Sequence, residues 1–128
     1  MMRAAELLGD LDRSVLRVSL IPVRPEAVAV RPVPRPLRRL WPKWAAAMTM
    51  PWGIYVRPDV LDGDDAALAR IIAHELIHAR QWKTHGPVRF LRQYLAEYVR
   101  GRARRLGHKR AYRNISLEAE AYDLVNRL

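Results

Sequence analysis

Residues 66 to 82 constrain the fold more than any other part of the chain. The segment contains no glycine or proline, and its apolar residues leave almost no polar side. A helix that is apolar nearly all the way round belongs in a protein interior. The segment therefore predicts a buried central helix from Ala66 to Trp82, with Asp64 as its N-cap and Gly86-Pro87 at its end.

Inside this helix, residues 74 to 78 read His-Glu-Leu-Ile-His, an H-E-x-x-H motif. Because a helix turns about 100° per residue, His74 and His78 share one face, at the spacing that lets two imidazoles hold one small cation. Glu75 lies one step round, where its carboxylate can act as a general base without being a ligand. The motif predicts a Zn²⁺ site; the alternative is a chance match on a core helix.

A catalytic zinc site usually has three protein ligands, so the motif is incomplete by itself. The longer form H-E-x-x-H-x-x-G-x-x-H is disfavoured, since Gln81 and Thr84 occupy its last two positions and His85 is displaced by one residue. The chain has no cysteine, which excludes a thiolate ligand. The third ligand is therefore expected elsewhere in the chain.

A carboxylate on a final helix, predicted from Leu117 to Arg127 with Ser116 as its N-cap, is the better third ligand. Glu118 and Glu120 both lie there and point about 200° apart, so one of them can face the cation. We favour Glu118, because small side chains follow it at helical spacing, and keep Glu120 as the alternative ligand. The alternative is that neither Glu118 nor Glu120 is a ligand and that both are solvent-exposed carboxylates in the first turn of the helix.

The proline-rich first part, residues 1 to 45, predicts little regular structure. Residues 3 to 12 indicate a short helix and residues 14 to 21 a strand. Six prolines between residues 22 and 42 favour extended backbone, with at most one short strand from Ala27 to Arg31.

Residues 46 to 128 form the predicted core of a single α+β domain. Gly53 to Val56 is β-prone and lies between Pro51 and Pro58. Since proline cannot donate to a ladder, we expect this strand at a sheet edge, where an extended peptide could pair with it.

A second helix is predicted from Val88 to Leu106, with arginines on its solvent side. One side of it carries a stripe that we expect to pack in the core: Phe90, Leu91, Tyr94, Leu95, Tyr98 and Val99.

The formal net charge of +10 is concentrated late in the chain. From Arg80 onward there are twelve basic residues and four acidic ones. This balance favours an anionic partner such as nucleic acid, acidic lipid or acidic peptide, although an arginine-rich composition is an alternative explanation. No stretch approaches the roughly 18 apolar residues of a membrane span and no signal-like block follows the first residues, so we expect a cytoplasmic protein.

The motif followed by Glu118-x-x-Ala121 resembles the gluzincin group of zinc metallopeptidases, in which a downstream Glu is the third ligand. Gln81, which extends the motif to H-E-x-x-H-x-x-Q, is similar to the small members called minigluzincins. The resemblance covers about residue 52 onward, and Tyr122 stands where many members have Asp. It implies a zincin-like fold: a small N-terminal sheet with an edge strand, a buried active-site helix and two further helices.

The resemblance also implies a zinc-dependent peptidase acting on a peptide or protein substrate. Glu75 would be the catalytic general base, and His74, His78 and Glu118 the metal ligands. A donor for the oxyanion is expected in the loop before the last helix, where Tyr112 is the candidate transition-state stabiliser beside His108 and Arg113. The alternative is a weak or inactive zincin-like scaffold that binds an anionic partner or docks in a larger assembly. The sequence does not fix a substrate or an oligomeric state.

Overall fold

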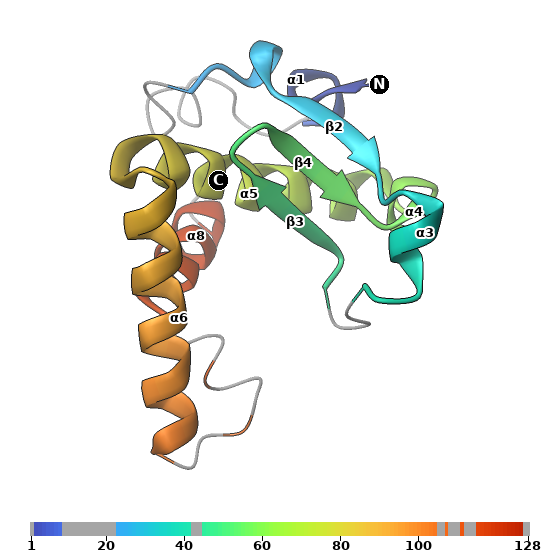
Figure 1. Cartoon of the computed structure of the whole chain (residues 1–128). Helices are drawn as coiled ribbons and strands as arrows, with labels where there is room; N and C mark the ends of the chain where they lie inside the picture. Colours follow the sequence, from blue (N-terminus) through green and yellow to red (C-terminus); the bar gives the residue numbers. More distant parts are fainter. Residues whose placement is uncertain are drawn as a thin grey trace.

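The computed structural model describes residues 2–8, 23–41, 45–104, 107, 111 and 115–126. It combines a four-stranded sheet with several helices, which confirms the α+β class (Figure 1). The elements of the sheet side are β1 (Met2–Arg3), α1 (Ala4–Leu7), η1 (Pro25–Ala27, a 3-10 turn), β2 (Ala29–Pro32), α3 (Arg35–Arg38), β3 (Ala47–Met50), β4 (Gly53–Val56) and α4 (Pro58–Leu61). The long helices are α5 (Asp65–His85), α6 (Pro87–Ala103) and α8 (Ser116–Asn126).

The sheet has the strand order β1-β2-β4-β3, with β2 and β4 parallel and the other pairs antiparallel. The expectation that residues 53–56 form an edge strand is wrong, because β4 pairs on both sides. Pro51 lies in the turn before β4 and Pro58 begins α4, so neither proline interrupts the ladder. The edge strands are β1 and β3, and on β3 Thr49 is paired with Ile54.

The predicted central helix is present as α5, three residues longer at its C-terminal end than expected. Asp64 caps it, accepting a hydrogen bond from the backbone N–H of Ala67 at 2.8 Å. Gly86 ends it with φ of 81°, in the left-handed region that glycine adopts readily. Its buried face packs against the sheet and α8 through a core that includes Val30, Ile54, Val56, Ile72, Ala73, Leu76, Ile77, Ala121 and Val125.

Both later helices match their predicted positions to within a few residues. The prediction of which α6 side chains pack in the core is only partly confirmed. Phe90 is buried in a second core cluster, and Tyr94 and Tyr98 pack against that cluster. Leu91, Leu95 and Val99 are exposed, contrary to the prediction. Figure 1 shows the reason: α6 (orange) extends away from the sheet, and described elements flank only one of its sides.

The proline-rich part and the core share one sheet, since β2 lies directly beside β4. The strand predicted at residues 27–31 is β2, and the opening helix is the short α1 within the described residues. The strand predicted at residues 14–21 lies outside the described residues. In the described part of the chain, no helix is both long enough and apolar enough to cross a membrane.

Candidate metal centre

Helices α5 and α8 bring three predicted ligands together. Nε2 of His74 lies 3.0 Å from Oε2 of Glu118, and Nε2 of His78 lies 3.0 Å from Oε1 of the same carboxylate. The two Nε2 atoms are 3.1 Å apart. All three ligand atoms lie within 4.8 Å of one another, close enough to hold one metal ion. The structure therefore contains a group that could bind a metal.

Neither alternative ligand belongs to this group. Glu120 is exposed on α8, and its Oε1 accepts a hydrogen bond from Nε2 of Gln81 at 3.2 Å. His85, at the C-terminal end of α5, is likewise outside the group. Glu118 is buried instead, as the opposite directions of residues 118 and 120 on a helix require.

Gln81 links the second histidine to the helix that carries the carboxylate. Its amide nitrogen donates to the backbone oxygen of Leu117 at 2.9 Å, which leaves its Oε1 to accept from Nδ1 of His78 at 2.7 Å. A neutral imidazole that donates from Nδ1 presents a free electron pair on Nε2, the atom facing the other ligands. Gln81 thus orients His78 and fixes the position of α8 one residue before Glu118.

We predict that Gln81→Leu weakens zinc binding by about 10- to 100-fold, because the leucine cannot accept the Nδ1 proton. Competition with a chromogenic chelator measures this affinity, and circular dichroism checks that the helices remain. Glu120→Gln is the matched control: it keeps an oxygen for Gln81 and should bind zinc like the wild type. Equal affinities of Gln81→Leu and wild type would contradict the orienting role.

Glu75 is buried beside the edge strand. The Thr49 hydroxyl lies within hydrogen-bond distance of the Glu75 carboxylate, and 2.9 Å from the backbone oxygen of the same residue. Nε1 of Trp82, one helical turn beyond His78, donates to the backbone oxygen of Thr49 at 2.8 Å. These contacts join β3 to α5 within the motif and one turn after it, and they hold the Glu75 carboxylate in one position.

His78 and Glu118 shift each other's pKa. Burial lowers the pKa of His78, but its hydrogen bond to Glu118 and the charges of Glu75 and Glu118 outweigh burial and raise the pKa to about 9. Burial raises the pKa of Glu118, but the hydrogen bonds with His74 and His78 outweigh it and hold that pKa well below its usual range. Tyr94 on α6 adds a hydrogen bond, donating to Oε1 of Glu118 at 3.0 Å.

These shifts predict opposite pH dependences of stability with and without metal. In metal-free protein the raised pKa of His78 stabilises the fold fully below its ordinary value of 6.5, and this contribution is lost as pH rises through about 9. Metal-free protein should therefore lose up to about 3 kcal/mol of unfolding free energy across that window. The lowered pKa of Glu118 contributes above its ordinary value of 4.5 and is lost as pH falls.

Stabilisation by added zinc should instead grow with pH, because the metal needs deprotonated imidazoles. Urea unfolding at mildly acidic and alkaline pH, with zinc or with a chelator, measures both slopes. His85→Gln, which changes a histidine outside the group, should leave both unchanged. A metal-free protein that gains stability towards alkaline pH would contradict the assignment.

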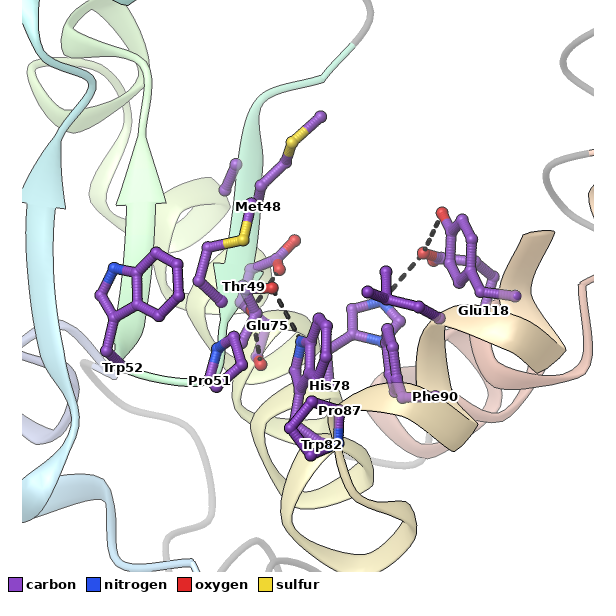
Figure 2. Close-up of a pocket in the computed structure, with 14 residues that line it drawn as sticks. Met48, Thr49, Pro51, Trp52, Glu75, His78, Trp82, Pro87, Phe90 and Glu118 are labelled. Carbon is purple, nitrogen blue, oxygen red and sulfur yellow. Dashed lines mark hydrogen bonds and ion pairs between the residues drawn. The ribbon is translucent and has the colours of Figure 1, made fainter.

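A cavity of about 470 Å³ opens beside His78 and Glu118, a volume typical of small-molecule or side-chain sites. Figure 2 shows Met48, Pro51 and Trp52 on its strand side, Phe90 and Glu118 across from them, and Glu75 and His78 between. Its lining is mostly apolar. A second cavity of about 340 Å³ shares Glu75 with the first and is lined by Arg70, His74 and Tyr122. Glu75 therefore lies where two cavities meet.

Three predicted residues lie outside the described part of the chain: Tyr112, His108 and Arg113. Tyr122, the residue that departs from the family pattern, packs its ring edge-on against His74 at 4.6 Å between centroids. The sequence reasoning missed Thr49, for which no local pattern gives a signal. It placed Tyr94 in the α6 core stripe without indicating that the tyrosine hydroxyl meets Glu118.

Comparison of the chain with models of protein families, with curated proteins and with solved structures finds no match.

Proposed function

We propose that the protein is a zinc-dependent peptidase of the gluzincin type with a zincin-like fold. The observation that carries the proposal is the convergence of two imidazole nitrogens and one carboxylate oxygen within 4.8 Å, next to the buried carboxylate of Glu75. Two histidines and one glutamate are a donor set that catalytic zinc sites use, with one position left for water. The residues present therefore fit a zinc ion.

Zinc in this position would lower the pKa of a water molecule and polarise a substrate carbonyl. Glu75 is the general base: its carboxylate accepts a proton from the attacking water as the new carbon–oxygen bond forms. The same carboxylic acid then gives that proton to the amine that leaves when the carbon–nitrogen bond breaks. Thr49 holds the carboxylate in place, and Gln81 and Tyr94 hold His78 and Glu118.

The edge strand β3 provides a way to position a peptide. Among the described residues no strand pairs with its outer edge, so the outer backbone groups of β3, apart from the Thr49 oxygen that accepts from Trp82, can hydrogen-bond to an extended chain. Thr49 on β3 touches Glu75, so a peptide paired there would pass beside the general base. One bulky apolar side chain of that peptide would fill the cavity lined by Met50, Trp82 and Phe90. The proposed substrates are therefore extended peptides with a large apolar residue beside the cleaved bond.

Metal analysis combined with a peptide library tests this proposal. Purified protein should contain about one zinc per chain and should cleave internally quenched peptides that carry bulky apolar residues. A chelator should abolish cleavage and added zinc should restore it. Zinc binding without cleavage of any library member would reject the peptidase and support the second candidate, a metal-stabilised scaffold with an anionic partner, which the exposed arginines of α6 favour.

A further inference from the structure

One side of α6 is apolar and exposed. We call Val88, Leu91, Leu95 and Val99 the α6 stripe. Their exposed fractions are 80, 48, 57 and 62 %. The spacings of three and four residues place all four on one side of the helix, over a length of about 16 Å. An apolar stripe of this length on the outside of a protein marks an interaction surface.

Exposed arginines lie beside and around the stripe. By the helical period Arg92 and Arg102 lie within about 60° of its centre, whereas Arg89 and Arg100 lie further round the exposed side. The one acidic residue of α6 is Glu97, and its carboxylate accepts hydrogen bonds from the hydroxyl of Ser116 at 2.8 Å and from the backbone N–H of Ser116 at 3.1 Å. The side of α6 that faces solvent is therefore apolar and strongly basic together.

We propose that this face of α6 docks on the surface of an anionic phospholipid bilayer. Such a surface satisfies both features: acyl chains accept the α6 stripe and acidic headgroups pair with the arginines. Nucleic acid would use the arginines but would leave the stripe in water. A second copy of the chain would cover the stripe but would bring two rows of arginines together. Of these three partners, only the bilayer matches both the apolar stripe and the arginines.

The α6 stripe is continuous with the cavity at the metal centre. Leu91 belongs to the stripe and also lines that cavity, and Trp52, 63 % exposed, lies on the opposite rim at the β3–β4 turn (Figure 2). Tryptophan favours the boundary between water and lipid. Docking through α6 therefore brings the cavity rim to the bilayer surface. If the proposed peptidase function holds, the substrates are peptides or proteins at the bilayer surface, because the cavity opens there.

Vesicle co-sedimentation of zinc-loaded, full-length protein tests the docking without any substrate. The protein should bind vesicles of phosphatidylcholine mixed with phosphatidylglycerol, bind phosphatidylcholine alone much more weakly, and lose binding as salt is added. The double variant Leu95→Ser/Val99→Ser should bind on the order of tenfold more weakly. Arg92→Gln/Arg102→Gln, which changes the two arginines beside the stripe, should lose about fivefold per arginine.

Matched controls lie on and just after α3. Leu37→Ser/Leu40→Ser removes two exposed apolar side chains, with exposed fractions of 48 and 81 %, and Arg35→Gln/Arg39→Gln makes the same change of charge. Both should bind vesicles like the wild type. If they lose as much binding as the α6 variants, the assignment to α6 is overturned. Binding to duplex DNA but not to vesicles, or a dimer that Leu95→Ser/Val99→Ser dissociates, would also overturn it. Loss of peptidase activity alone would leave it standing.

Discussion

Glu75→Gln should slow peptide hydrolysis by about 10²- to 10⁴-fold while the zinc content stays unchanged, because an amide cannot accept the proton of the attacking water. Glutamine has nearly the size of glutamate and still offers an oxygen to the Thr49 hydroxyl, so the packing between β3 and α5 is retained. The turnover number and the zinc content should be measured on the same sample.

Glu120→Gln makes the same chemical change on an exposed glutamate and should leave hydrolysis within about twofold of wild type. If Glu75→Gln hydrolyses peptides at the wild-type rate, Glu75 is not the general base. If the variant loses its zinc, the carboxylate holds the metal and the division of roles between Glu75 and Glu118 is wrong.

Glu118→Ala should weaken zinc binding by more than about 100-fold, since loss of a direct ligand exceeds the cost of losing a residue that only orients one. In the wild type, zinc at about 1,000 times its dissociation constant should stabilise the fold by about 4 kcal/mol. At the same zinc concentration the variant should keep about 1.4 kcal/mol of this stabilisation or less. Isothermal titration and thermal unfolding with and without zinc measure the two effects.

Glu120→Ala is the matched control for this second experiment, because it removes a carboxylate from the same helix two residues away. It should bind zinc within a few-fold of wild type. A reversal, with Glu120→Ala losing the metal and Glu118→Ala keeping it, would show that α8 presents its other face to the ion in solution.

Local patterns predicted the long helices well, because the signals for them lie within the segments themselves. Asp64 and Gly86 bound α5 as expected, and the continuous apolar run between them requires burial. Sheet order depends instead on which strands meet in space. Pro51 and Pro58 led to the prediction that residues 53–56 form an edge strand. Both prolines lie just outside β4, however, and leave its hydrogen-bonded ladder intact.

In the candidate site, too, the features that lie within one helix were predictable and the contacts between elements were not. The spacing of His74 and His78 is a property of one helix, and helical geometry lets only one of Glu118 and Glu120 face them. The small side chains after Glu118 favoured it, and it is the glutamate that lies with the two histidines. Sequence patterns did not predict the contacts between different helices and strands. By its position in the sequence Tyr94 belongs to the predicted core side of α6. Only the approach of α6 to α8 brings its hydroxyl to the carboxylate of Glu118. The exposure of Leu95 likewise depends on which elements lie near α6.

In the order of synthesis, Glu118 of the candidate metal centre comes long after the two histidines. His74 and His78 lie on α5, whereas Glu118 lies 40 residues beyond the second of them, on α8. A ribosome must therefore translate β3, α5 and α6, and then release α8 from its exit tunnel, before all three groups can meet. A nascent chain that still lacks residue 118 cannot form the complete cluster, so any hydrolysis that depends on it begins only after translation has passed that point.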